Sequence, residues 1–433
     1  MGYSELHSQK IARPEEALNL VHSGMNIILA GDGNCPHIFA KSLSAVTERV
    51  IGVKVFKDHT NAMDFVNDPR SAGHIESIGF FYGKDFIEGM NYGTCSYFPT
   101  DLCNYASFII HHYKPDLFVT AATQMDDEGN FHISLCDMWE GEILEFCIEN
   151  GVPVIVEENA NLPYVTGAPK INIEKVAAVI EAGYKPGEIK GVVPSEDEIK
   201  VAQNVRSLLR DGDCVQFGIG SLPDAIAAQC MDLRDLGLHT EMITTALGKM
   251  IREGVITGER KNLHKGEHIF TFAGGDEALY RTLGENPRCR IVPGSYGVNP
   301  RIIMQNDNMV SVNTLIEMDM TGQVCSESIG PKQYSGSGGG MDYAYGALMS
   351  RGGRGIMAFT SVTKKGYSKI KPMLTPGAAV TVPRNYVDYI VTEYGIAPMR
   401  GRTVKERVNN LIAAAHPDFR EELRFAAKKH LYI

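Results

Sequence analysis

This sequence of 433 residues lacks the signals of several protein classes. No apolar run approaches the ~20 residues that a membrane-spanning helix needs, and the opening segment has no apolar signal core. The nine cysteines are an odd number and include no Cys-x-x-Cys pair, which argues against a disulfide framework and a zinc site. These absences lead us to expect a cytoplasmic protein with free thiols.

Several catalytic and binding motifs are also missing. The sequence has no H-E-x-x-H metalloprotease motif, no G-x-S-x-G elbow and no Gly-Lys-Ser/Thr of a P-loop. A formal charge of −10 argues against a nucleic-acid or anionic-membrane surface. Carboxylates and backbone amides remain as candidate chemical groups, so we expect no metal.

The chain does contain an internal repeat. Residues 17–40 resemble 205–227, and 119–131 resemble 312–324, in the same order and at nearly the same offset. Because two such matches in register are improbable by chance, they predict a duplicated domain. The matched pairs are Gly24 with Gly212, Ile27 with Val215, Leu29 with Phe217, Met125 with Met318, Asp126 with Asp319 and Gly129 with Gly322.

Each copy of the repeat has the pattern of an open α/β sheet. Ser195 and Glu198 have capping-box spacing before a helical apolar stripe, and Gly212 suits the end of that helix. A short apolar strand, a glycine turn and a second helix follow. Further strands are expected at 290–296, 309–315, 355–362, 378–382 and 388–395, and a helix at 404–415.

The length is too great for one hydrophobic core and suits two or three domains. Proline, glycine and charged residues cluster at 184–198, where we place a linker. We therefore expect an α/β domain over 1–190 and a second over 191–433.

The turn "FGIGSLPD" contains Gly218 and Gly220 between a strand and a helix, where dinucleotide folds bind pyrophosphate. Pro223 stands near the place of the third glycine in that fingerprint. We favour a tight turn that lines a cleft, and keep a dinucleotide-dependent oxidoreductase as an alternative.

The stretch "YSGSGGGMDY", residues 334–343, has a glycine composition that excludes a helix or an ordinary strand. Its backbone amides can converge on a ligand oxygen. A flexible surface loop is the competing interpretation, but three flanking tyrosines argue against it. The glycines are Gly336, Gly338, Gly339 and Gly340.

Two isolated carboxylates are candidate reagents. Glu241 lies in the apolar stretch "GLHTEMITTA" with no basic residue close in sequence, although it could simply face water. Glu393 ends a predicted strand, but it has possible partners a short loop away in Arg400, Arg402 and Lys405. Pairing is therefore the stronger interpretation for Glu393.

The segments "GIGSLPDAI", "LGLHTEMI", "SIGPKQYSGSGGGMDY" and "VTEYGIAPMRGRTVKERVNNLIAAAHPDF" follow one another as in a known family. The sequence resembles the acetyl-CoA hydrolase/transferase family of class I CoA-transferases, especially its 4-hydroxybutyrate and butyrate–acetate members. The resemblance implies two tandem, duplicated open α/β domains of the CoA-transferase type. It also implies a homodimer or higher oligomer, with coenzyme A as a substrate and no tightly bound cofactor.

The resemblance also implies roles for single residues. Glu241 would be the nucleophile, and Asn299 and Gly339 would stabilise the oxyanion. Asp342 and Tyr343 would shape the wall on the CoA side. The residues expected around CoA are Gly218, Gly220, Gly336, Gly338, Gly339, Gly340, Asp342 and Lys365, with Lys332, Lys369 and Arg384 as further candidates for its phosphates.

The implied reaction moves CoA between a short-chain acyl-CoA and a free carboxylate such as acetate, butyrate or 4-hydroxybutyrate. An ionised glutamate needs no general base and can form an acyl-glutamyl anhydride and then a glutamyl-CoA thioester. Thr244, Thr245 and Ala246 replace the family's usual Ser-Asp-Gly, so the acid stays open. An acyl-CoA hydrolase and a non-catalytic CoA-binding module are alternatives.

Overall fold

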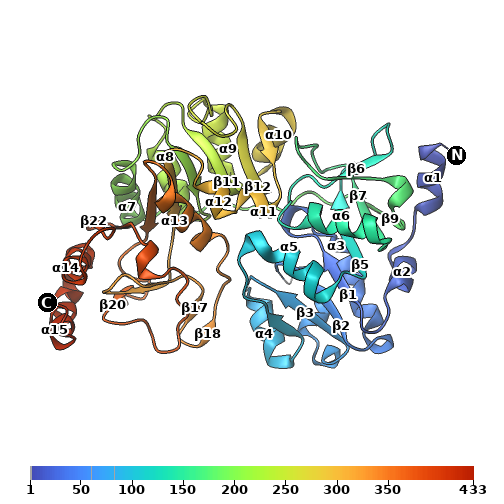
Figure 1. Cartoon of the computed structure of the whole chain (residues 1–433). Helices are drawn as coiled ribbons and strands as arrows, with labels where there is room; N and C mark the ends of the chain where they lie inside the picture. The colour runs from blue at the N-terminus through green and yellow to red at the C-terminus, as the bar shows by residue number, and fades with distance from the viewer. Residues whose placement is uncertain (1, 60, 82) are drawn as a thin grey trace. The chain divides into compact units, whose positions relative to one another are not determined.

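The computed structural model describes residues 2–59, 61–81 and 83–433 (Figure 1). The chain forms two compact units. Unit 1 contains Met1–Ile189 and Phe270–Gly297, and unit 2 contains Lys190–Ile269 and Val298–Ile433. The chain thus leaves unit 1 beside the predicted boundary. A segment of 28 residues, 270–297, then returns to unit 1, whereas the expected ranges 1–190 and 191–433 contain no such return.

Unit 1 is built on a parallel sheet of seven strands in the order β4-β3-β2-β1-β5-β7-β9. Its strands are apolar and buried along most of their length, as parallel strands covered on both faces are. They are β1 (Asn26–Leu29), β2 (Val53–Phe56), β3 (Ile75–Gly79), β4 (Cys95–Tyr97), β5 (Leu117–Ala122), β7 (Val154–Asn159) and β9 (Ala178–Ala182).

Helices surround this sheet, as the blue and cyan part of Figure 1 shows. They are α1 (Tyr3–Lys10), α2 (Pro14–Ala17), α3 (His37–Ser42), α4 (Lys84–Tyr92), α5 (Tyr105–Phe108) and α6 (Glu140–Asn150). A small antiparallel pair joins β6 (Asn130–His132) to β8 (Lys170–Asn172). The returning segment begins within β12 (His268–Gly274) and also holds α10 (Glu277–Glu285), β13 (Cys289–Ile291) and α11 (Gly294–Gly297).

Unit 2 has the same kind of main sheet, with six of its strands in the order β11-β10-β14-β19-β21-β22. All of these pairs are parallel except β21 with β22. The strands are β10 (Cys214–Phe217), β11 (Gly237–Thr244), β14 (Met309–Asn313), β19 (Arg354–Ala358), β21 (Tyr389–Thr392) and β22 (Gly395–Pro398).

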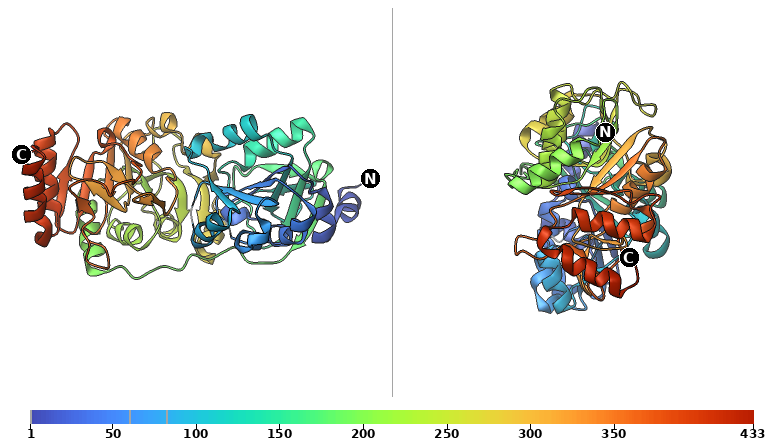
Figure 2. Two further views of the ribbon diagram at one scale, coloured as in Figure 1. Left: turned by 90° about the horizontal axis from the view of Figure 1, so that it is seen from below. Right: turned by 90° about the vertical axis from the view of Figure 1, so that its left-hand side faces the viewer.

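The helices of unit 2 include a C-terminal pair, α14 and α15, which pack against each other (red in Figure 2). The helices are α7 (Glu196–Arg206), α8 (Ser221–Gln229), α9 (Thr245–Arg252), α12 (Pro300–Ile303), α13 (Gly340–Met349), α14 (Val404–Ala414) and α15 (Arg420–Lys429). Short strands form two small sheets, β16 (Val324–Cys325) with β15 (Glu317–Asp319) and β20 (Ile370–Lys371), and β17 (Ser328–Ile329) with β18 (Lys332–Gln333).

The predicted duplication is confirmed by strand order and register. The order β2-β1-β5-β7-β9 in unit 1 recurs as β11-β10-β14-β19-β21 in unit 2. Ile27 pairs with Val55 in unit 1, and its sequence match Val215 pairs with Leu238 in unit 2. Leu29 pairs with Val119 and Phe217 with Val312, which are the first residues of the second repeated segment.

Some local predictions were confirmed and others were wrong. The capping box of Ser195 and Glu198 begins α7, but that helix ends at Arg206. Gly212 is therefore not its C-terminal cap; it lies in a turn with a left-handed φ of 82°, and Gly24 has 78°. Residues 378–382 form no strand, because their backbone contributes a single bridge from Val382 to Val324.

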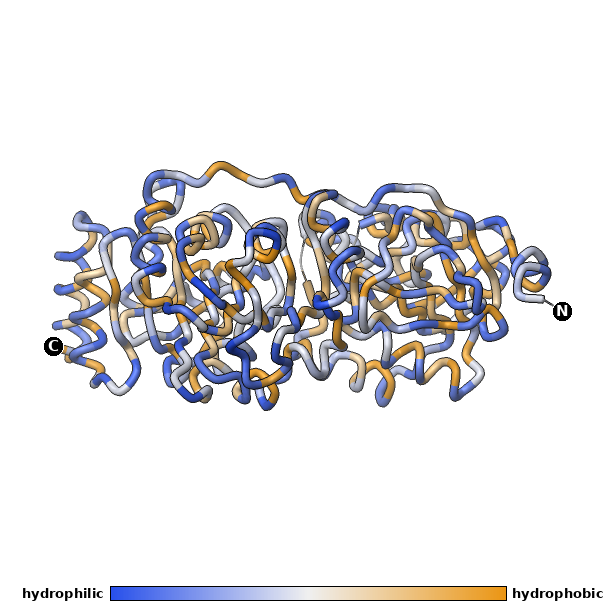
Figure 3. Tube along the Cα trace, turned by 90° about the horizontal axis from the view of Figure 1, so that it is seen from above, coloured by the Kyte–Doolittle hydropathy of each residue, from blue (hydrophilic) through white to orange (hydrophobic). Residues whose placement is uncertain are grey.

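Apolar and polar residues are interspersed along the whole trace (Figure 3). Apolar side chains form the buried core of each unit, such as Ile27, Val55 and Val119 in unit 1 and Met318, Ile390 and Leu411 in unit 2. Within the described residues, no helix combines the length and the apolar character needed to cross a membrane.

Candidate active site

Glu241 lies in the middle of β11, with its side chain half-buried between buried neighbours on the strand. The backbone N–H of Gly339 donates a hydrogen bond of 3.0 Å to Oε2 of Glu241. Two segments that are 98 residues apart, the apolar stretch and the glycine-rich loop, therefore meet at this carboxylate.

Gly339 has to be a glycine at this contact. A Cβ added there would lie 2.4 Å from Glu241 Oε2 and 2.7 Å from Val298 Cγ1, closer than real Cβ atoms come. Gly338 has a left-handed φ of 52°, which also favours glycine. The helix α13 then begins at Gly340, so the prediction that the whole stretch is non-helical was wrong for Gly340, Asp342 and Tyr343.

The surroundings of Glu241 set its protonation. Burial raises the pKa of this carboxyl to about 7, and the hydrogen bond from Gly339 opposes that rise. Tyr343 is fully buried, and burial, followed by the charge of Glu241, raises the pKa of its phenol. Near neutral pH, a large fraction of Glu241 is thus ionised yet poorly hydrated, which suits a nucleophile.

Asn299 caps α12, because its Oδ1 accepts a 3.0 Å hydrogen bond from the N–H of Arg301. The residue before it is Val298, whose side chain lies next to Gly339. The cap uses the side-chain oxygen, whereas stabilising an oxyanion would use the amide nitrogen. The two roles are therefore chemically compatible.

The remaining predicted binding residues lie at different places in unit 2. Gly218 follows β10, where its N–H donates to Val312 O at 3.2 Å. Gly220, with φ 111°, precedes α8, so these glycines form the predicted turn at the carboxyl end of β10. Asp342 is buried in the first turn of α13, whereas Lys365 is exposed in a turn after β19.

Glu393 is bound differently from the prediction. Its carboxylate accepts a hydrogen bond of 2.8 Å from the N–H of Ser361 and a second from the hydroxyl of the same residue. Arg402, one of its predicted partners, lies 3.7 Å from Glu406 instead. Glu393 therefore fixes the segment after β19.

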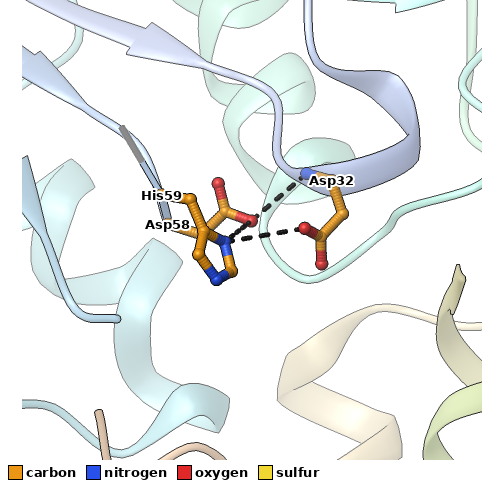
Figure 4. Close-up of side chains that lie close together, drawn as sticks. All are labelled: Asp32, Asp58 and His59. Carbon is orange, nitrogen blue, oxygen red and sulfur yellow. Dashed lines mark hydrogen bonds and ion pairs between the residues drawn. The ribbon is translucent and has the colours of Figure 1, made fainter. Parts of the chain in front are cut away.

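Unit 1 contains a cluster that the sequence reasoning did not identify, formed by Asp32, Asp58 and His59 (Figure 4). His59 Nδ1 lies 3.1 Å from Asp58 Oδ2 and 3.6 Å from Asp32 Oδ1. Nζ of Lys57, also buried, lies 2.7 Å from the other oxygen of Asp58. The run of charged residues directly after the buried strand β2 is the signal that could have revealed it.

This cluster offers three potential metal-ligand atoms within 4.8 Å of one another. A divalent ion there would have to share Asp58 with the buried ammonium of Lys57, which already balances the carboxylate. The residues therefore fit an ion-pair network better than a metal site, and we assign no metal to them.

Sequence comparisons identify two family models along the chain. The acetyl-CoA hydrolase/transferase N-terminal domain matches residues 1–194, and the acetyl-CoA hydrolase/transferase C-terminal domain matches residues 275–427. The chain is 34% identical to succinyl-CoA:cyclohexane-1-carboxylate CoA transferase of Geobacter metallireducens, covering 99% of this chain and 97% of that one. It is 33% identical to 4-hydroxybutyrate coenzyme A transferase of Clostridium kluyveri, covering 99% and 100%.

More distant relatives include acetyl-CoA hydrolase of Schizosaccharomyces pombe, which is 25% identical over 62% of this chain and 52% of that one. Among solved structures, RipA from Yersinia pestis is similar with a TM-score of 0.93 and 31% identity, covering both chains fully. The matches extend over almost the whole sequence and both units. The chain therefore belongs to the acetyl-CoA hydrolase/transferase family.

Proposed function

We propose that this protein is a CoA-transferase that moves CoA between a short-chain acyl-CoA and a free carboxylate through Glu241. The observation that carries the proposal is the half-buried Glu241 carboxylate, which a glycine-loop N–H contacts at 3.0 Å and which has a pKa raised to about 7. An acid in this state is both a competent nucleophile and poorly hydrated.

The enzyme class follows from the similar proteins. Curated relatives at about one third identity and over nearly their full length are CoA-transferases, and both family models are those of CoA hydrolases or transferases. The chain is on these grounds an enzyme that acts as a CoA-transferase. The residue roles and the covalent steps are our own proposal.

The reaction would run in two symmetrical halves. The Glu241 carboxylate attacks the thioester carbonyl of the acyl-CoA, and CoA thiolate leaves as an acyl-glutamyl anhydride forms. The thiolate then attacks the glutamyl carbonyl of the anhydride, which gives a Glu241–CoA thioester and releases the first carboxylate. A second carboxylate attacks this thioester, and the same steps in reverse deliver the new acyl-CoA and regenerate Glu241.

Each step passes through a tetrahedral oxyanion that needs hydrogen-bond donors. The N–H of Gly339 already points at the Glu241 carboxylate, so it can follow charge that develops on the glutamyl carbonyl. The amide of Asn299 is our second candidate, since its backbone follows Val298 beside Gly339. We expect CoA to bind along the glycine-rich loop and the Gly218–Gly220 turn.

The acids in the names of the relatives include 4-hydroxybutyrate, butyrate, succinate and cyclohexane-1-carboxylate, and our proposal of a short-chain acid agrees with the first two. An acyl-CoA hydrolase is the second candidate, because the same family includes hydrolases at lower identity. Water that reached the anhydride would convert the transferase into a hydrolase. Cytoplasmic location and a homodimer or higher oligomer stay predictions from the sequence.

Isotope exchange can test the proposal. The protein is incubated with unlabelled acyl-CoA and the matching labelled carboxylate, with no second acid. A ping-pong transferase moves label into the acyl-CoA without net consumption of thioester. Thioester loss that needs no added carboxylate, with no label exchanged, would establish hydrolysis instead.

A further inference from the structure

The first residues of the glycine-rich loop are bound to Glu327, at the start of the β17–β18 hairpin. The backbone N–H groups of Tyr334 and Ser335 both donate to the carbonyl oxygen of Glu327, at 2.8 and 2.9 Å. One carbonyl therefore fixes the point where the chain leaves β18 and enters the loop.

Side chains around the loop entrance add a second set of hydrogen bonds. Nε2 of Gln333 donates to Glu327 Oε2 at 3.0 Å and to the carbonyl oxygen of Ser335 at 2.6 Å. The hydroxyl of Thr381 donates to Glu327 Oε1 at 2.8 Å. Glu327 and Thr381 are buried, so these bonds form largely away from water.

The far end of the loop is fixed by the active site and by α13. The N–H of Gly339 donates to Glu241 Oε2, and its carbonyl oxygen accepts from the N–H of Tyr343 at 2.9 Å. Only residues 336–338 separate this end from the Glu327 contacts. A shift at the near end would therefore reach the N–H of Gly339.

We propose that Gln333, held by Glu327, is a positioning residue that aims the N–H of Gly339 at Glu241. The inference rests on the proposed role of Glu241. Gln333 connects the buried carboxylate of Glu327 to the backbone of Ser335, so it orients the loop without contacting the reacting atoms. Losing its amide releases the Ser335 carbonyl and lets the loop entrance move.

The pH profile separates positioning from general stability. Burial raises the pKa of Glu241, and the hydrogen bond from Gly339 opposes that rise. A loop that drifts away from Glu241 would change both the hydrogen bond and the burial of the carboxylate, and would therefore move the acid limb of the pH–rate profile. A loss of fold alone would reduce the amount of active enzyme without moving that limb.

The test compares Gln333→Leu with the matched variant Gln323→Leu. Gln323 is also half-buried, and its Nε2 donates to a buried carboxylate, Asp319 Oδ2, at 2.6 Å. Its contacts lie in a different turn from the glycine-rich loop. We expect Gln333→Leu to lower kcat by about 10- to 100-fold, the scale of a small misplacement, and to shift the acid limb away from its wild-type position.

Gln323→Leu should leave the acid limb where it is in the wild type. Equal pH profiles in both variants, or wild-type kcat in Gln333→Leu, would overturn the inference. If Gln333→Leu does not fold, Glu327→Gln and Glu327→Ala replace it. The amide oxygen of Glu327→Gln can still accept from Gln333, so it should retain the wild-type acid limb, whereas Glu327→Ala should not.

The proposed function can fail separately from this inference. Full activity in Glu241→Gln would refute the nucleophile itself. An inactive Glu241→Gln combined with an unchanged Gln333→Leu would refute the positioning role alone.

Discussion

The two units carry a carboxylate at corresponding positions by strand register, although Glu241 lies within β11 and Asp58 lies two residues beyond the end of β2. Val55 of β2 corresponds to Leu238 of β11 by register, and three residues further each chain has an acid, Asp58 in unit 1 and Glu241 in unit 2. The residue before Asp58 is Lys57, whereas the residue before Glu241 is Thr240. One duplicated position has therefore acquired two different electrostatic settings.

The surroundings of the two acids shift their pKa values in opposite directions. Burial would raise the pKa of Asp58, but the ammonium of Lys57 and the adjacent His59 together outweigh it and hold that pKa well below its ordinary value. Burial raises the pKa of Glu241 to about 7. Asp58 is thus ionised and paired with Lys57, while the carboxylate of Glu241 accepts a hydrogen bond from a backbone N–H. The neighbouring groups, rather than the position in the fold, thus set the direction in which each pKa is shifted.

The largest expected effect is the loss of catalytic rate when Glu241 is neutralised. If Glu241 is the nucleophile, as we propose, Glu241→Gln should lower kcat by about 10⁴-fold or more, because the attacking carboxylate is lost. It should not lower stability, since it removes a poorly hydrated acid. Steady-state kinetics and denaturant unfolding measure the two effects, and a variant with more than a tenth of wild-type activity would contradict the nucleophile assignment.

In unit 1, by contrast, we expect the loss of a charged partner to lower the stability of the fold. Lys57→Met would leave the buried Asp58 charge without its partner and should cost about 3–5 kcal/mol of unfolding free energy. The double variant Lys57→Met with Asp58→Leu should recover much of that loss. Urea unfolding of both variants checks this, and additive losses would show that the two residues are not an energetic pair.

Gly339→Ala should damage the site by steric contact. The new Cβ would lie 2.4 Å from Glu241 Oε2, so the loop and the carboxylate must separate. We expect kcat to fall about 100-fold. At Gly340 an added Cβ meets nothing within 4 Å. Gly340→Ala should therefore have a far smaller effect on kcat, and equal losses at both positions would refute the steric explanation.

The two acids should also differ in their response to pH. Because the folded pKa of Glu241 lies above its unfolded value of about 4.5, the folded state loses stability as pH rises from about 4.5 to 7. Asp58, with a depressed folded pKa, contributes stability above its unfolded value and loses it as pH falls.

Unfolding measured from pH 5 to 8 tests that contrast. The stability of Glu241→Gln relative to the wild type should increase with pH and level off above about 7. The catalytic rate of the wild type should rise over the same range as Glu241 ionises. A constant stability difference would show that the pKa of Glu241 is not raised.

The smallest expected effect concerns the exposed Lys365. If it contacts a CoA phosphate, Lys365→Ala should raise KM for acyl-CoA by about 1.4- to 5-fold, as for an exposed ion pair of ~0.2–1 kcal/mol. The effect should shrink with added salt, and kcat should not change. A salt-independent loss of kcat would assign the residue a different role.

The fold could be predicted from the sequence because repeats and apolar periodicity can be recognised in short stretches of residues. The match of Ile27 with Val215 predicted the duplication that the strand registers confirm. The meeting of Glu241 with Gly339 was expected only through family resemblance, since 98 residues separate them. The partner of Glu393 was predicted wrongly, because nearness in sequence favoured arginines while the strand order brought Ser361.

The cluster of Asp32, Asp58 and His59 was not predicted from the sequence for a related reason. Lys57, Asp58 and His59 are adjacent in sequence, but Asp32 joins them through the turn after the neighbouring strand β1. Its equivalence to the Glu241 position needs the register of both sheets. Neither fact follows from residue spacing alone.

The most direct test of the central claim is to identify the covalent intermediate. The enzyme is incubated with acyl-CoA, treated with borohydride or hydroxylamine, and mapped by peptide mass spectrometry, with Glu241→Ala as the control. The account predicts an acyl-CoA-dependent modification on the peptide that contains Glu241, absent from the control. An unmodified Glu241 in fully active enzyme, or the same label in Glu241→Ala, would contradict it.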